Sequence, residues 1–125
     1  MKKYFAMVVL FLSLIASAFA SQKPTVTDWR EVPGGPFTRV GVAPYNFYFS
    51  PSTVSKEENL AGVAVEAVPT DGTPIRYSLY VFDCLANQYR YETYDRSTDT
   101  WSQSSEARDI VPNTANAYLK PLVCQ

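Results

Sequence analysis

The sequence predicts an α+β domain, a five- to six-stranded antiparallel sheet with one short C-terminal helix packed on it. Three observations lead to this fold class. Short stretches rich in Val, Tyr and Phe alternate in polarity and are separated by Gly, Pro and Asp turn signals. Apolar residues recur at helical spacing close to the C-terminus. One cysteine lies in each kind of segment, Cys84 and Cys124.

The first strands are short and are bounded by proline. Residues 29–32 predict a strand that stops at a Pro-Gly-Gly-Pro turn. Residues 37–42 alternate weakly and fit either a strand or an irregular link. The aromatic run 45–49 predicts a strand that ends before Pro51, because proline cannot donate a ladder hydrogen bond. Residues 55–59 are charged and predict a surface loop.

The central strands have the clearest patterns. Residues 60–68 alternate, so four apolar side chains share one face of the predicted strand: Ala61, Val63, Val65 and Ala67. Asp71 and Gly72 predict the turn of a hairpin. Residues 75–84 place apolar side chains at both odd and even positions, which predicts a central strand covered on both sides.

The next segments predict a second hairpin and one more strand. Residues 85–88 connect the central strand to a Tyr-rich strand at 89–95. A polar turn follows at 96–99, and Trp101 stands alone just after it. Residues 106–111 predict a last short strand.

The C-terminal segment predicts a short amphipathic helix. Asn113 is expected to cap it, and an apolar stripe follows at i, i+3, i+4 and i+7: Ala115, Tyr118, Leu119 and Leu122. Pro121 lies within this stripe and is expected to kink or stop the helix, because it removes one backbone hydrogen bond.

Residues 1–20 predict a cleaved signal peptide. Lys2 and Lys3 precede an apolar run at 4–16, and the sequence Ala-Phe-Ala before Ser21 is typical of a signal peptidase site. The run is shorter than the roughly 20 residues of a membrane span. No cysteine follows it for lipid attachment. We therefore expect residues 21–125 to form a single exported domain, periplasmic or at the cell surface, without a lipid anchor or a membrane span.

Both cysteines remain in that exported domain, so a disulfide is expected, and only the Cys84–Cys124 pairing is possible. The bridge would close a loop of about 40 residues and stabilise the domain by about 4 kcal/mol. It would also hold the helix against the sheet face that carries Tyr80 and Phe82.

The composition argues against several classes of function. The chain contains no histidine, which removes the commonest general base and metal ligand. The formal net charge is −1, and it falls further when Lys2 and Lys3 leave, so a nucleic-acid partner is not expected. Asp95 and Asp99 flank a turn without the dense oxygen ligands of a calcium loop. We expect no catalytic residue, cofactor or metal.

Exposed tyrosine and arginine on a rigid sheet often anchor protein contacts. The run 89–94 is either an ordinary strand, with Arg90 and Tyr94 on its outer face, or part of such a contact surface. Trp101 has the same two interpretations. Arg90, Tyr94 and Trp101 are therefore the candidate partner-binding residues.

The chain resembles the surface-adhesin protein E family of small exported bacterial domains. The resemblance rests on the order of several features: Trp29, the aromatic strand and turn at 47–54, the strand ending at Asp83-Cys84, the strand ending at Tyr94-Asp95, Trp101, and the helix ending at Cys124. The family implies an antiparallel sheet with a disulfide-tethered C-terminal helix and, more remotely, adhesion to extracellular-matrix proteins.

Three functions follow as hypotheses. The first is a non-catalytic module that binds a matrix or envelope protein, in the manner of an adhesin. The alternative is a periplasmic structural or small-ligand-binding protein, which a pocket beside Tyr80 and Phe82 would favour. A hydrolase that uses carboxylates alone is a third and weaker hypothesis. The sequence leaves open a homodimer formed through an edge strand.

Overall fold

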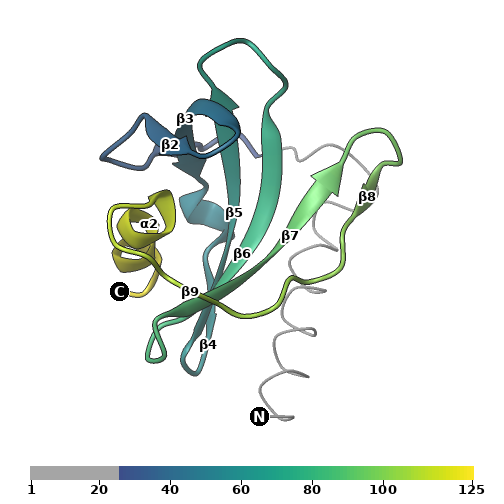
Figure 1. The fold of residues 1–125 in the computed structure, drawn as a ribbon. Coiled ribbons are helices and arrows are strands. Elements are labelled where there is room, and N and C mark those ends of the chain that lie inside the picture. Colours follow the sequence, from purple (N-terminus) through teal and green to yellow (C-terminus); the bar gives the residue numbers. More distant parts are fainter. Residues whose placement is uncertain (1–25) are drawn as a thin grey trace.

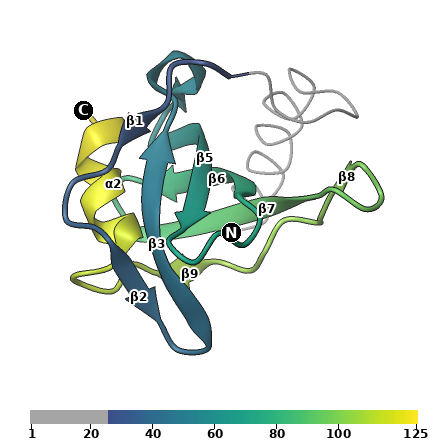
Figure 2. The same ribbon diagram turned by 90° about the horizontal axis from the view of Figure 1, so that it is seen from above.

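The computed structural model describes residues 26–125, so the predicted signal peptide, residues 1–20, lies outside the described residues. The described chain forms one antiparallel sheet with a single α-helix against one of its faces (Figures 1 and 2). This confirms the predicted combination of an antiparallel sheet and a short C-terminal helix. None of the helices in this part of the chain is long and apolar enough to cross a bilayer.

The sheet follows the order β1-β3-β5-β6-β7-β8, while β2 pairs with β3, β4 with β5 and β9 with β7. The elements are β1 (Arg30–Glu31), β2 (Phe37–Arg39), β3 (Val42–Phe49), the 3-10 helix η1 (Pro51–Thr53), β4 (Ser55–Glu57), β5 (Leu60–Pro69), β6 (Arg76–Asp83), β7 (Gln88–Asp95), β8 (Thr100–Trp101), β9 (Arg108–Asp109) and α2 (Ala115–Val123).

The predicted number of five or six strands is wrong, because the described sheet has nine. Three positions in the described sheet are each shared by two strands. β1 and β2 lie along β3, β3 and β4 lie along β5, and β8 and β9 lie along β7. The charged segment at 55–59, expected as a loop, therefore contributes β4, and Trp101 belongs to β8.

Each interruption has a local cause. The Pro-Gly-Gly-Pro turn separates β1 from β2, and Gly34 adopts φ +102° there. A Cβ at Gly34 would lie 3.0 Å from the ring of Tyr118, so glycine is required for both its backbone angle and its size. Between β3 and β4, Pro51 opens η1, and Ser50 is fully buried with its hydroxyl 2.6 Å from the Asp28 carboxylate.

The hairpins on either side of β6 are closed by aspartate side chains. Asp71 accepts hydrogen bonds from the backbone amide and the hydroxyl of Thr73, and Gly72 adopts φ +82°. This confirms the predicted turn. After β6, Asp83 accepts from the amides of Leu85 and Ala86.

The sheet has two apolar faces. On the helix face, one cluster of the described residues holds 13 buried side chains, which come from the strands, from α2 and from Val32 and Ile110 just outside them. It includes the predicted set Ala61, Val63, Val65 and Ala67. On the opposite face, which we call the outer face, a smaller cluster consists of Leu60, Ala64, Leu79 and Val81, with Val26, Trp29 and Trp101 against it. β6 contributes to both clusters, as predicted for a central strand covered on both sides.

α2 lies where the sequence predicts it, with one correction at its N-terminus. Its N-cap is Thr114, whose hydroxyl accepts from the amide of Ala117, whereas Asn113 adopts φ +66° outside the helix. Pro121 does not stop the helix, which continues to Val123.

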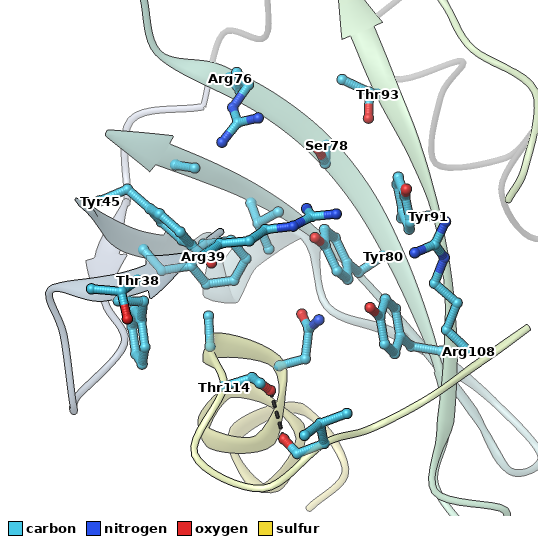
Figure 3. Close-up of a pocket in the computed structure, with 18 of the residues that line it drawn as sticks. Thr38, Arg39, Tyr45, Arg76, Ser78, Tyr80, Tyr91, Thr93, Arg108 and Thr114 are labelled. Carbon is cyan, nitrogen blue, oxygen red and sulfur yellow. Dashed lines mark hydrogen bonds between the residues drawn. The ribbon is translucent and has the colours of Figure 1, made fainter. Parts of the chain in front are cut away.

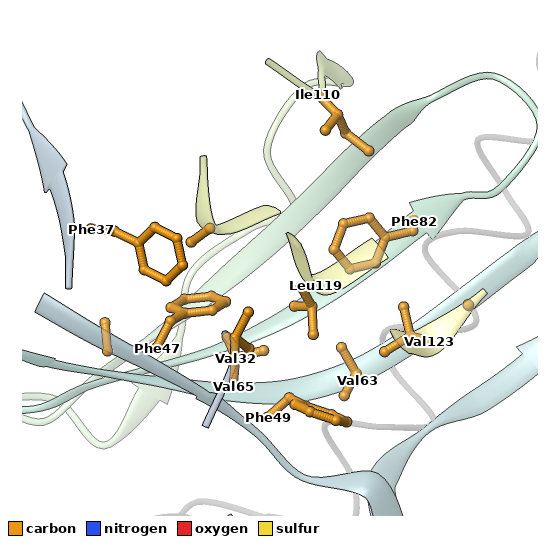
Figure 4. Close-up of a cluster of buried hydrophobic side chains, with 13 residues drawn as sticks. Val32, Phe37, Phe47, Phe49, Val63, Val65, Phe82, Ile110, Leu119 and Val123 are labelled. Atoms are coloured by element: carbon orange, nitrogen blue, oxygen red, sulfur yellow. The ribbon is translucent and has the colours of Figure 1, made fainter. Parts of the chain in front are cut away.

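The disulfide between Cys84 and Cys124 is present, with the two Cα atoms 5.8 Å apart, and it confirms the predicted pairing. Figure 4 shows Leu119 and Val123 of α2 directed at Phe82 and Val63 of the sheet. The predicted docking of the helix on the face of Tyr80 and Phe82 is therefore confirmed.

Candidate functional site

A pocket opens on the helix face, beside the N-terminal end of α2. Its volume is about 370 Å³, and it lies between the sheet, the β2–β3 hairpin and the segment that leads into α2 (Figure 3). Of the two residues that the small-ligand hypothesis named, Tyr80 lines the pocket and Phe82 does not.

Small side chains in adjacent strands create the hollow. The register places Ser78 of β6 between Val65 of β5 and Thr93 of β7. Ala67 of β5 lies two pairs further along, opposite Arg76. Because side chains on one face alternate along a strand, these groups share the helix face, and none of them is large enough to fill the space in front of the sheet.

Tyrosines form the wall of the pocket nearest the filled core. The ring of Tyr80 is stacked at 5.7 Å from Tyr89 and at 5.6 Å from Tyr91, measured between centroids. Its edge meets Phe47 at 5.9 Å. Tyr45 continues the aromatic lining on the far side of Phe47. The pocket thus offers ring faces together with phenol hydroxyls.

Tyr80 is the most strongly perturbed of these groups. Burial raises the pKa of its phenol far above the ordinary value, and the neighbouring Tyr89, Tyr45 and Tyr91 add to the effect. Burial also raises the pKa of Tyr45, although Arg39 and Arg76 oppose that shift. Both phenols therefore remain protonated at neutral pH and can donate hydrogen bonds into the pocket.

Three arginines surround the same space: Arg39 from β2, Arg76 from β6 and Arg108 from β9. The guanidinium of Arg108 lies over the ring of Tyr91, 5.4 Å from its centroid. Figure 3 shows Arg39 extending across the pocket toward Tyr80. Within residues 26–125, no carboxylate forms an ion pair with any of the three.

One acidic residue lines the pocket, and two acidic residues of the neighbouring strands face away from it. Asp109 is the one acidic residue in the lining, and its carboxylate accepts a hydrogen bond of 3.0 Å from the Gln88 amide. Glu66 and Glu92 alternate with lining residues along β5 and β7, so they belong to the outer face. The lining therefore carries three guanidinium groups against one carboxylate, a net positive charge among the described residues.

Polar groups at the start of α2 complete the lining. The hydroxyl of Thr114 donates to the carbonyl of Val111 at 2.7 Å, the bond drawn in Figure 3. The Oδ1 atom of Asn116 is buried and has no hydrogen-bond partner among the described residues. Asn116 also lines the pocket, so its amide is placed to meet a bound group.

The three predicted partner-binding residues lie outside this pocket, on or near the outer face. Tyr94 and Trp101 are brought together, since they pair across β7 and β8 with ring centroids 5.3 Å apart. Arg90 lies four residues before Tyr94 on the same face of β7, and it donates to the carbonyl of Ser105 at 3.1 Å.

The expected outward exposure of Tyr94 is wrong, because only 9% of it is accessible. The ring of Trp101 covers it, and its hydroxyl donates to the carboxylate of Asp99. Strand alternation correctly assigned Tyr94 to the outer face of β7. It did not reveal that Trp101 covers Tyr94, because strand β8 was not predicted.

The arginines of the pocket were not among the residues predicted from the sequence. One usable signal was present, because Arg76, Ser78 and Tyr80 occupy alternate positions and must share a face of one strand. The contributions of Arg39 and Arg108 depend on β2 and β9, whose pairing with β3 and β7 the sequence pattern did not define.

The described part of the chain brings no three His, Cys, Asp or Glu side chains together in a way that could hold a metal ion. No family model, curated protein or solved structure matches the chain. The resemblance to the surface-adhesin protein E family therefore stays a prediction.

Proposed function

We propose that this chain is a non-catalytic binding protein whose pocket between α2 and the sheet holds a small ligand. The observation that carries the proposal is the cavity of about 370 Å³ beside Tyr80. Small-molecule sites in proteins have volumes of about 300–1,000 Å³ and combine an apolar lining with a few polar groups. This function is the small-ligand alternative of the two predicted from the sequence.

The chemistry of the lining supports binding more than catalysis. Tyrosine hydroxyls, guanidinium groups and the Asn116 amide supply hydrogen bonds, while Phe37, Phe47 and Val65 supply apolar contact. A hydrolase that uses carboxylates needs two of them across the reacting bond. The lining supplies one, Asp109, and Gln88 already binds it.

The scaffold also supports a preformed site. The floor consists of β5, β6 and β7, which are paired along most of their length. The disulfide between Cys84 and Cys124 holds α2 on the same sheet. A site on paired strands needs little ordering when a ligand enters, so more of the contact free energy appears as affinity.

A matched pair of variants tests this proposal. Ala67→Leu places three additional carbon atoms in the floor of the pocket, and Ala86→Leu makes the same change on the exposed turn after β6. The measurement is the melting temperature in the presence of each member of a panel of metabolite-sized compounds. Compounds that bind the folded state raise the melting temperature by mass action.

We expect some compounds to stabilise the wild-type protein and Ala86→Leu but not Ala67→Leu. If no compound raises the melting temperature, or if Ala67→Leu responds as the wild type does, the pocket is not a ligand site.

Protein binding at Arg90, Tyr94 and Trp101 is the second candidate function. It is favoured by the position of Arg90 and Trp101, which are both partly exposed along the same edge of the sheet. The test is a pull-down from envelope and host-matrix extracts with the wild type and with the double variant Arg90→Ala, Trp101→Ala. A partner that both proteins recover equally would count against this surface.

Both proposed functions include export of the protein from the cytoplasm. A disulfide is typical of proteins in oxidising compartments, and the Cys84–Cys124 bond supports an exported, periplasmic or cell-surface location. Cell fractionation combined with protease treatment of intact cells distinguishes the two locations. An adhesin-like role requires that protease reaches the protein from outside, whereas a periplasmic binding role requires that it does not.

A further inference from the structure

We infer that the pocket selects a small organic anion that carries a planar ring. This inference rests on the proposed ligand-binding function and defines the chemical class of the ligand. It is drawn from two features of the lining, the unpaired positive charge and the tyrosine wall.

The charge of the pocket differs in sign from that of the chain. The formal net charge of the whole sequence is −1, yet three guanidinium groups converge on one cavity. All three arginines are exposed at the rim of the cavity, so solvent weakens their mutual repulsion without removing it. An anionic ligand group would remove the repulsion and gain charge-assisted hydrogen bonds of the kind that guanidinium makes with carboxylate or sulfonate.

The three arginines also come from separate strands. Arg39 belongs to β2 at one edge of the sheet, Arg76 to the first position of β6, and Arg108 to β9 at the opposite edge. Within the described chain, none has a carboxylate partner that a ligand would need to displace. Arg39 lies close enough to influence the pKa of both Tyr45 and Tyr80, so an anion bound by Arg39 would sit beside two phenol donors.

The tyrosine wall favours a flat ring next to that anion. Tyr80 and Tyr91 are stacked with an interplanar angle of 23°, and Tyr80 and Tyr89 with an angle of 17°. A wall of nearly parallel rings presents its faces and edges to a flat aromatic group at offset-stacking distance. Val65, Ala67 and Phe47 form the apolar floor beneath it.

Two fluorescent dyes that differ by one sulfonate test the inference. The anion is 8-anilino-1-naphthalenesulfonate, and its neutral counterpart is N-phenyl-1-naphthylamine. Both become fluorescent when they leave water for an apolar site, so one titration method measures both affinities. Ala67→Leu identifies the signal that arises from the pocket rather than from other apolar surface.

We expect the anionic dye to bind the wild type at least about tenfold more tightly than the neutral dye, a difference of about 1.4 kcal/mol. Arg39→Gln and Arg76→Gln should each weaken the anionic dye by about tenfold and leave the neutral dye unchanged. Arg30→Gln is the matched control, because it removes the same charge from an exposed position of β1 outside the pocket.

Competition tests the ring. Naphthalene-1-sulfonate should displace the anionic dye at far lower concentration than inorganic sulfate or octane-1-sulfonate. Equal displacement by the three anions would overturn the requirement for a ring. Equal affinity for the two dyes in the pocket would overturn the requirement for charge while leaving the proposed function intact. If neither dye gives a signal that Ala67→Leu removes, both the inference and the proposed function are contradicted.

Discussion

The two halves of the helix face differ in how the space above the sheet is filled. In the filled half, under the C-terminal end of α2, large side chains are at most 4% exposed: Phe49, Val63, Phe82, Leu119 and Val123. In the hollow half, beside the N-terminal end of α2, the pocket occupies about 370 Å³. Both halves stand on the same strands, β5 and β6, so the difference comes from side-chain size and from the position of the helix.

The comparison indicates that the filled half stabilises the fold and that the hollow half is available for binding. The disulfide and the tightest packing lie in the filled half, where Cys124 follows directly on α2 and Cys84 on β6. The hollow half carries three arginines without carboxylate partners among residues 26–125. Binding sites commonly contain groups that lower stability, and here a stable neighbouring half offsets that cost.

Of the changes that distinguish the two halves, removal of the disulfide in the filled half should have the largest effect on the free energy of unfolding. Cys84→Ala with Cys124→Ala releases a loop of 40 residues and should lower the free energy of unfolding by about 4 kcal/mol. Urea denaturation at neutral pH measures the loss. Reduction of the wild type with dithiothreitol should reproduce it, and a loss below about 1 kcal/mol would show that the filled half does not depend on the bond.

Truncation within the filled half should cost slightly less. Leu119 is fully buried against the sheet, so Leu119→Ala should lower the free energy of unfolding by about 2–5 kcal/mol. Ala67→Leu, an enlargement in the hollow half, should change it by less than about 1 kcal/mol, because the added atoms enter empty space. Comparable losses in the two variants would mean that the halves are packed alike.

Charge removal in the hollow half should have a smaller effect of opposite sign. Arg39→Gln with Arg76→Gln reduces the repulsion around the pocket and should raise the free energy of unfolding by about 0.5 kcal/mol or less. The gain should fade in 1 M salt, where the Debye length is about 3 Å. Arg30→Gln should show neither effect. Destabilisation by the double variant would indicate that these arginines hold the fold.

The smallest effect concerns Asp28, which lies at the margin of the filled half. Hydrogen bonds from the Ser50 hydroxyl, and then from Ser52, hold the pKa of Asp28 below its usual 3.8. A lowered pKa means that its contribution is complete above the unfolded-state value and is lost as the pH falls through the folded-state value. Asp28→Asn should therefore flatten the loss of stability between about pH 4 and 2, and urea titrations across that range would detect it.

Local sequence patterns predicted the filled half well. The alternation of β5 assigned its core face, and the cysteine count assigned the disulfide that places α2. The alternation is visible within one short segment, and two cysteines allow only one pairing. The N-cap was displaced by one residue because Asn113 adopts the left-handed backbone, which leaves Thr114 to bind the amide of Ala117.

Those local patterns could not predict the hollow half. Its floor depends on the register that aligns Ala67, Ser78 and Thr93 from separate strands, and one residue of slip would move each of them to the outer face. Its arginines depend on β2 and β9, which are three and two residues long. Strands this short give almost no periodic signal, so tertiary pairing alone defines them.

The short strands at the two edges of the sheet have a further consequence, which concerns association between copies of the chain. At one border β1 and β2 are two and three residues long, and at the other β8 and β9 are two residues each. Amyloid-like growth and strand exchange need a long, straight row of free amides and carbonyls. Within residues 26–125, borders this broken offer no such template, so a concentrated solution of this tyrosine-rich domain should resist fibre formation.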